Sequence, residues 1–343
     1  MAYDLFGTRE MTQAVLQLKP IGNFFRSVFF NRPAEEHNSL LIDIDIYKGQ
    51  RKVAPYTKAT SKSTPLARTQ YKTGSFTIPY IKLSRSLEAV QTQLRGIGEN
   101  IYSDKTPLQR ANEQMAKDLA EIEEAIQRAE ELQAAQAIVN AKITIKGETV
   151  DAEIDLLRDP LLTFTVAAAD LWTAGTADIH QQLRTYARLV FSKSGFTPNM
   201  LIGGPAALDA LFANAGVRSL LDNRRIVGGK IDTGATTTPP YPGARHYGDL
   251  AGFDIWEYSE MYLDDFDNLD KPMIPADSIV LASSGMRCVP HYGPIMDFGA
   301  LVPLKRFAKS IEEQDPSVKT AIVQSAPAMI NHDPDATAKI KVV

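Results

Sequence analysis

The sequence predicts an α+β protein built from several distinct parts. Three observations predict this class: a long stretch of helical periodicity (residues 107–139), a basic segment between strand-like flanks (47–85), and a later region in which helical and strand-like patterns mix (161–305). Hydrophobic side chains make up 44% and charged side chains 23% of the 343 residues, which excludes a wholly disordered chain. A formal charge of -4 excludes a protein that is basic throughout, the pattern of many nucleic-acid binders.

Residues 1–46 are predicted to form an N-terminal arm. Five apolar side chains gather in it: Phe24, Phe25, Val28, Phe29 and Phe30. Their spacing of four predicts a short helix with one aromatic face, and Pro33 ends that helix. The aromatic face either caps the core of its own chain or packs against a neighbouring subunit. In the second alternative, the candidates for contacts between subunits are Phe25, Phe29 and Phe30.

Residues 47–85 are strongly basic and contain no Asp or Glu. Alternation in the flanks predicts an extended two-stranded hairpin, which is marginally stable alone because such a ribbon buries little apolar area. It must therefore lie on another surface, either nucleic-acid phosphate or an acidic protein. We favour a protein surface because aromatic residues that could stack on bases are sparse. The candidate contact residues are Arg51, Lys52, Lys58, Lys62, Arg68 and Lys72.

Residues 86–160 are predicted to form a domain around a helix that spans residues 107–139. Thr106 and Gln109 have the spacing of a capping box, and Pro107 suits the first helical position. Apolar residues at steps of three and four predict one buried face. The other face is acidic and is predicted to face solvent, with Glu113, Asp118, Glu121, Glu123, Glu124, Glu130 and Glu131. A hairpin that turns at Lys146 and Gly147 is predicted to follow the helix.

Residues 161–305 are predicted to form an α/β domain. One helix ends at Gly195, and a strand, a turn at Gly203-Gly204-Pro205 and another helix follow. Residues 228–248 are rich in Gly, Pro and Thr and are predicted to form a loop. Residues 306–343 are predicted to return to the domain of the long helix.

The sequence offers no catalytic, cofactor or metal site. The Gly203-Gly204 turn lacks the spacing of a phosphate-binding loop. Cys288 is the single cysteine, which excludes a disulfide within the chain and a thiolate metal cluster. No two of the five histidines (His37, His180, His246, His291 and His332) have the spacing of a helical metal-binding pair. We therefore predict a protein that is not an enzyme and has no cofactor or metal.

The sequence shows neither a membrane-spanning segment nor a secretion signal. No apolar run reaches the length needed to cross a bilayer, and the first residues lack the basic and apolar regions of a secretion signal. We therefore expect synthesis in a reducing cytoplasm and no contact with a membrane.

Several local motifs resemble the major capsid proteins of tailed bacteriophages in the phage lambda family, which have the HK97 fold. The order of the predicted parts is similar as well: an N-terminal arm, an extended hairpin (the E-loop), a peripheral domain with a spine helix, and an inserted α/β axial domain. The similar segments are FFRSVFF (24–30), LDNRR (221–225), HYGDLAGFDIWEYS (246–259), PADSIVLASSG (275–285) and VQSAPAMINHDPDATAKIKVV (323–343).

The resemblance implies a structural function in the virion. Subunits of this family form hexamers and pentamers that close into an icosahedral head shell around phage genomic DNA. The implied partners are further copies of the chain, a scaffold protein, a decoration protein, a portal and, without specificity, packaged double-stranded DNA. Assembly is expected in the cytoplasm of the host bacterium.

The resemblance also implies where subunits touch. The hairpin would lie over an adjacent subunit, with its basic side chains opposite carboxylates such as Glu121, Glu124 and Glu131. Residues 228–248, together with Arg224 and Arg225, are the candidates for the tip of the axial domain at the centre of each capsomer. No crosslink between Lys and Asn is predicted, because residues 47–85 contain no Asn.

Three other functions stay open at this point. An encapsulin-like shell has the same fold and encloses a cargo enzyme in place of DNA. A soluble α/β enzyme would need a nucleophile and a base in contact. A DNA-binding protein that uses the basic hairpin would bind DNA as a monomer in a salt-sensitive manner.

Overall fold

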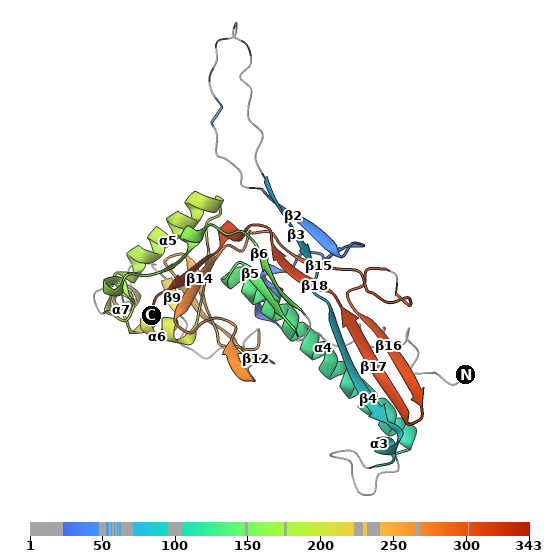
Figure 1. Ribbon diagram of the computed structural model, residues 1–343. Helices are drawn as coiled ribbons and strands as arrows, with labels where there is room; N and C mark the ends of the chain where they lie inside the picture. The colour runs from blue at the N-terminus through green and yellow to red at the C-terminus, as the bar shows by residue number, and fades with distance from the viewer. Residues whose placement is uncertain are drawn as a thin grey trace.

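The computed structural model describes residues 23–47, 53–54, 56, 58, 60, 62, 71–94, 105–147, 150–174, 177–222, 229–231, 241–264, 268–300 and 302–343. Its long helix α4 (Pro107–Val139) runs beside a narrow three-stranded sheet, and a wider sheet with its own helices lies beyond the C-terminal end of α4 (Figure 1). Helices and mixed sheets thus occur together, and the predicted α+β class is confirmed. Among the described helices, none is both long enough and apolar enough to cross a bilayer.

Helix α4 begins and ends where the sequence predicts. The Thr106 hydroxyl accepts a hydrogen bond from the Gln109 N–H at 3.3 Å, and the Thr106 N–H donates to Gln109 Oε1 at 2.9 Å. This reciprocal pair satisfies two backbone N–H groups, one at Thr106 and one in the first helical turn, that no bond inside the helix reaches. The capping box therefore fixes the start of the helix at Pro107.

One face of α4 packs on the three-stranded antiparallel sheet. The strands are β16 (Phe307–Gln314), β17 (Ser317–Ser325) and β4 (Ile81–Glu88), in the order β16-β17-β4, and the short helix α3 (Ala89–Gln93) follows β4. Their apolar side chains meet the helix in one buried cluster, which consists of Met115, Leu119, Ile122 and Ile126 with Ala308, Ala321 and Val323. The helical periodicity predicts this buried apolar stripe, and its burial stabilises the packing of α4 on the sheet.

The prediction that the acidic face of α4 is solvated is wrong for four of its seven residues. The buried ones are Asp118, Glu123, Glu130 and Glu131. The physical reason is that other segments cover this side of α4 and bring arginines. Arg26 of the N-terminal arm and Arg306 before β16 lie against the glutamates, and Arg85 of β4 lies 3.6 Å from Asp118. Glu113 and Glu121 remain exposed, and the Glu124 side chain is half-exposed.

The arm packs on its own chain through the helix α2 (Phe24–Phe29). Phe24, Phe25 and Phe29 of α2 and the following Phe30 are at most 5% exposed and belong to a core cluster that also contains apolar residues from the C-terminal end of α4. The alternative in which the aromatic face caps the core of its own chain therefore describes the arm. In the isolated chain the rings of Phe25, Phe29 and Phe30, the candidates for contacts between subunits, are already covered by their own chain.

A small sheet continues from the arm. The strand β1 (Glu35–Glu36) lies parallel to β15 (Cys288–Tyr292), which pairs in turn with β18 (Pro327–Asn331). Cys288 is fully buried in this sheet.

The extended hairpin is present, with different strand limits from those predicted. Its described strands are β2 (Leu41–Tyr47) and β3 (Tyr71–Thr77), which pair antiparallel from Leu41 opposite Thr77 to Tyr47 opposite Tyr71. The predicted range of 47–85 therefore begins too late, and it includes β4, which belongs to the sheet on α4. Pro79 separates β3 from β4, since proline has no N–H to continue a ladder.

The α/β domain is organised around a seven-stranded mixed sheet in the order β7-β19-β14-β8-β11-β10-β9. The strands are β7 (Thr163–Thr165), β19 (Ala338–Lys341), β14 (Ser278–Ala282), β8 (Met200–Gly203), β11 (Phe253–Tyr258), β10 (Ala244–Leu250) and β9 (Gly229–Ile231). The helices are α5 (Ile179–Ser194), α6 (Pro205–Ala213) and α7 (Ala215–Asp222). Helix α5 ends, as predicted, at Gly195, whose φ of 86° places it in the left-handed region that favours glycine.

The last segment of the chain is divided between two parts of the molecule. Strands β16, β17 and β18 return to the region of α4, as predicted for 306–343, whereas β19 joins the wide sheet between β7 and β14. In this position Ala338, Ile340 and Val342 are almost wholly buried in the core of the α/β domain. Two further ladders are β5 (Lys142–Lys146) with β6 (Asp151–Asp155), the predicted hairpin, and β12 (Met261–Asp264) with β13 (Leu269–Pro272).

Candidate functional site: a buried charge cluster and the exposed assembly surfaces

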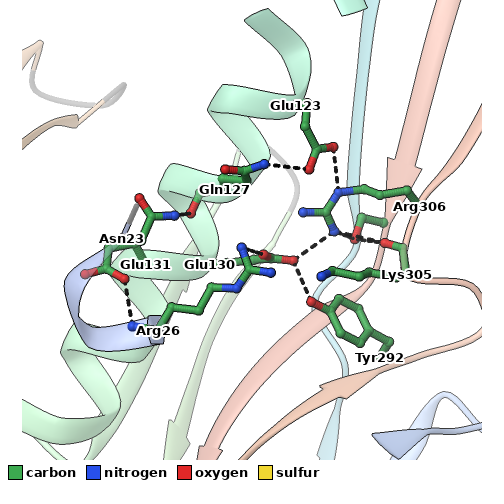
Figure 2. Close-up of polar contacts among 10 residues, drawn as sticks. Asn23, Arg26, Glu123, Gln127, Glu130, Glu131, Tyr292, Lys305 and Arg306 are labelled. Atoms are coloured by element: carbon green, nitrogen blue, oxygen red, sulfur yellow. Dashed lines mark hydrogen bonds and ion pairs between the residues drawn. The ribbon is translucent and has the colours of Figure 1, made fainter. Parts of the chain in front are cut away.

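A cluster of buried charges joins the arm, the spine helix and the strand β16. We define the charge cluster as Arg26 of α2, Glu123, Glu130 and Glu131 of α4, and Arg306, which precedes β16 (Figure 2). The arm, α4 and the segment before β16 are distant in the sequence, and Figure 2 shows Glu131 directed at the arm helix and Glu123 directed at Arg306.

Glu130 lies at the centre of the charge cluster and is fully buried. Its Oε1 accepts hydrogen bonds from Arg306 Nη1 at 2.8 Å and from the Tyr292 hydroxyl at 3.0 Å, and its Oε2 lies 3.0 Å from Arg26 Nη1. Burial alone would raise the pKa of this carboxyl, but the two guanidinium groups outweigh burial and lower the pKa below its usual value. Glu130 is therefore a carboxylate that neutralises the buried Arg306 and Arg26, whose side chain is 19% exposed.

Arg306 distributes its donors over two elements, α4 and β17. Its side chain is 2% exposed, and Nε donates to Glu123 Oε2 at 2.8 Å while Nη1 also donates to Ser325 Oγ at 3.0 Å. Burial acts to lower the pKa of the guanidinium, but Glu130 and Glu123 raise it overall, so Arg306 stays a cation. These bonds hold the beginning of β16 against α4.

Glu131 binds the N-terminus of the arm helix. Its Oε1 accepts from the Phe25 N–H at 2.7 Å and from the Tyr258 hydroxyl at 3.0 Å, and its Oε2 accepts from the Arg26 N–H at 2.9 Å. The first N–H groups of a helix have no partner inside the helix, so a side chain of α4 supplies it here. Burial raises the pKa of Glu131 above its usual value. Glu131 is a candidate receiver for a basic residue of another subunit, and in the isolated chain both its oxygens are bound within its own chain.

The aromatic side chain of Phe24 connects the arm to the α/β domain. Its ring centroid lies 5.7 Å from that of Tyr241, 5.2 Å from Trp256 and 5.2 Å from Tyr258. Trp256 and Tyr258 belong to β11, so α2 is packed between the spine helix and the wide sheet. The arm therefore holds the two large parts of the subunit together.

Some of the candidate residues for contacts between subunits are described by the structure, and others are not. Lys58 and Lys62 are exposed, together with Val53 and Tyr56 of the same hairpin. Lys72 lies in β3 opposite Ile46. The candidates Arg51, Lys52, Arg68, Arg224 and Arg225 lie outside the described residues, as do residues 232–240 of the predicted tip at 228–248.

The two exposed acidic candidates on α4 already have partners in their own chain. Glu121 Oε2 lies 2.5 Å from Arg85 Nη2, and Glu124 Oε1 lies 2.8 Å from Arg128 Nη2. Solvent-exposed ion pairs of this kind contribute about 0–1 kcal/mol, so they can exchange partners at little cost.

The thiol of Cys288 does not have the properties of a nucleophile. Burial raises the pKa of this thiol well above its usual value, so it stays uncharged. The turn from β8 to α6 at Gly204 is closed by the backbone of Pro275 and Ala276, which a Cβ at Gly204 would meet at 2.4 and 2.6 Å. This close packing gives the glycine a structural role at the turn.

Sequence reasoning missed the arginines of the charge cluster and the two tyrosines, Tyr292 and Tyr258, that donate hydrogen bonds to its carboxylates. One signal was present: Ile122, Ile126 and Glu130 follow one another at steps of four, so Glu130 continues the apolar stripe and had to be buried. A second signal was Arg26, which lies in the middle of the aromatic segment of the arm.

The family model and the similar proteins point to the same family. The family model "Phage major capsid protein E" matches residues 7–342. The major capsid protein of Enterobacteria phage P21 is 26% identical over 348 residues, which cover 98% of this chain and 99% of the relative. The major capsid protein of Escherichia phage lambda is 26% identical over 282 residues, 79% of this chain and 80% of the relative.

Solved structures show the same fold. A putative capsid protein of a prophage from E. coli CFT073 superposes with a TM-score of 0.72 at 18% identity and covers 98% of this chain and 99% of its own. The mature capsid of bacteriophage PhiM1 gives a TM-score of 0.52 at 11% identity over 95% of this chain and 88% of its own. The predicted HK97 fold is thereby confirmed.

The family settles the class of function. Its members are structural proteins of phage heads, so the predictions of a tailed-phage major capsid protein and of a chain that is not an enzyme are confirmed. The match extends over nearly the entire length, from the arm to the strand β19. The chain belongs to the phage major capsid protein E family.

Proposed function

We propose that this major capsid protein assembles as hexamers and pentamers into an icosahedral shell that encloses double-stranded phage DNA. The observation that carries the proposal is the contrast between two apolar surfaces. The aromatic arm is buried within the chain, whereas the hairpin presents Val53 at 86% and Tyr56 at 101% exposure. Exposed apolar side chains on a ribbon with a basic tip are typical of a surface that another subunit covers.

The proposed contact is between the hairpin and an acidic surface of the adjacent subunit, with Glu121 and Glu124 as receivers. Each exposed ion pair contributes only about 0–1 kcal/mol, and symmetry repeats the pair in every subunit of the shell. Weak repeated contacts let wrongly placed subunits dissociate during assembly. In the same proposal, Arg224, Arg225 and residues 228–248 lie around the axis of the capsomer.

The proposed partners are a scaffold protein during assembly, a portal at one vertex and a decoration protein on the outside, with assembly in the cytoplasm of the host bacterium. The experiment is electron microscopy and sedimentation velocity of the full chain, expressed alone and together with the scaffold of its phage. Closed shells support the proposal. Shells that purify with a cargo enzyme and no nucleic acid would favour an encapsulin-like function, and a uniform monomer in both preparations would refute assembly.

Charge reversal at the hairpin is expected to reduce assembly without unfolding the chain. Lys58 and Lys62 are exposed, so the double variant Lys58→Glu, Lys62→Glu keeps the thermal unfolding temperature of the unassembled chain and lowers the yield of shells at least tenfold. The matched control is Lys58→Arg, Lys62→Arg, which retains both charges and the yield. An equal shell yield from the Glu variant, measured by sedimentation, would show that the charges do not contribute.

A further inference from the structure

Three of the five histidines, which are far apart in the sequence, meet at the β1-β15-β18 sheet. The parallel register places Glu35 beside His291, and the His37 N–H donates to the Tyr292 carbonyl at 2.9 Å, which fixes His37 next to the same strand. His332 follows β18, and its N–H donates to the Arg287 carbonyl at 2.9 Å. Backbone pairing therefore brings the three imidazoles to one place.

We propose that Glu35, His37 and His291 bind one divalent transition-metal ion of the zinc type. His37 Nε2 lies 2.8 Å from His291 Nδ1, and Glu35 Oε2 lies 3.7 Å from the same nitrogen. All three ligand atoms lie within 4.8 Å of one another. Two imidazole nitrogens and one carboxylate oxygen are a donor set that zinc and related ions prefer.

The geometry needs only a small adjustment to hold the ion. Zinc–nitrogen bonds of about 2.0–2.1 Å in a tetrahedral site set the two nitrogens about 3.3 Å apart, so His37 must move outward by about 0.5 Å. His37 is partly exposed and the Glu35 side chain is 47% exposed, so both have room to move. The same exposure leaves the fourth coordination position open to water.

The outer contacts suit a metal ligand. His291 is 2% exposed, and its Nε2 lies 3.2 Å from His332 Nε2. When His291 Nε2 donates that hydrogen bond, its Nδ1 lone pair faces His37 and Glu35, which is how a second partner orients a ligating histidine. Arg287 Nη2 lies 3.5 Å from Glu35 Oε1 and so leaves Oε2 directed at the site. The positive charge of Arg287 lowers the affinity, and the anionic ligand Glu35 offsets it.

The ion would join two segments that the short β1-β15 ladder pairs. Glu35 and His37 lie between the arm helix and the hairpin strand β2, whereas His291 lies in β15 of the core. A bound metal would therefore clamp the base of the hairpin to the core and raise the stability of the folded chain. The inference does not depend on the proposed assembly, because binding is measured on the unassembled chain.

The test uses the full chain, stripped of metal with a chelator and dialysed, and titrated with zinc chloride in a calorimeter at neutral pH. We expect one zinc ion per chain, a rise in unfolding temperature with zinc, and visible absorption bands of a four-coordinate site with cobalt(II). His37→Gln and Glu35→Gln are expected to weaken zinc binding at least tenfold. The matched control is His246→Gln, which removes an exposed histidine of β10 and keeps the wild-type affinity.

Two results would overturn the proposal: no zinc binding by the wild-type chain, or binding that neither variant weakens. Circular dichroism without metal establishes that each variant is folded. Because the Glu35 side chain lies at the surface, Glu35→Gln decides the test even if His37→Gln fails to fold.

Discussion

Replacement of Glu130 by glutamine is expected to lower the free energy of unfolding by about 3–5 kcal/mol, because it leaves the buried Arg306 and the partly buried Arg26 without their shared counter-charge. Glu130 is fully buried and contacts both Arg306 and Arg26. Glutamine has nearly the same size, so the effect isolates charge from packing. Urea unfolding of the unassembled chain at neutral pH measures it.

The matched control is Glu124→Gln on the same helix. Glu124 pairs with Arg128 at the surface, four residues along α4, so its loss is expected to cost about 0.3–0.5 kcal/mol. The Glu130 effect also depends on pH, because the pKa of Glu130 is lowered from 4.5 by its arginines. The contribution is therefore present above pH 4.5, and the difference between wild type and variant shrinks as pH falls further. Equal effects of the two substitutions at neutral pH would contradict the role of the charge cluster.

Phe24→Ala is expected to cost about 3–5 kcal/mol, the usual range for removing a fully buried phenylalanine. The ring is wholly buried among Phe25, Tyr241, Trp256 and Tyr258, so its loss leaves a cavity between the arm, the spine helix and β11. Thermal unfolding measures the loss. Tryptophan fluorescence should shift to the red as water reaches Trp256.

The control for Phe24 is Phe298→Ala, which removes a ring that is 96% exposed in the unassembled chain. A change within about 0.5 kcal/mol is expected for that surface position. If Phe24→Ala lowered the free energy of unfolding as little as Phe298→Ala, the result would contradict the role of the arm in holding the two parts of the subunit together.

The local parts of the fold could be predicted from the sequence because nearby residues determine them. The capping box at Thr106 and Gln109 sets the start of α4, and Gly195 ends α5 through its left-handed conformation. The family motifs of the C-terminal segment identified the fold before any contact was known. These features depend on spacing along the chain, which a sequence displays directly.

The predictions that were wrong concern features that depend on which other segments cover each helix or strand. Seven acidic residues on one side of a helix suggested a solvated face, because nothing local reveals that Arg26 and Arg306 arrive from segments far away in the sequence. The same limit hid the meeting of His37, His291 and His332, since spacing rules detect metal pairs on one helix and not across strands. Strand β19 was misplaced because its alternating pattern fits either sheet.

A cryo-electron microscopy reconstruction of assembled shells tests the central claim most directly. The claim is that the arm packs on its own subunit and that the hairpin contacts the neighbouring subunit. The predicted result has Lys58 and Lys62 of one subunit within about 4 Å of carboxylates of the adjacent subunit. Helix α2 then remains on its own α4, with Glu131 at its N-terminus, as in the isolated chain. A shell in which α2 lies on the α4 of a neighbour, or in which the hairpin folds onto its own subunit, would contradict this account.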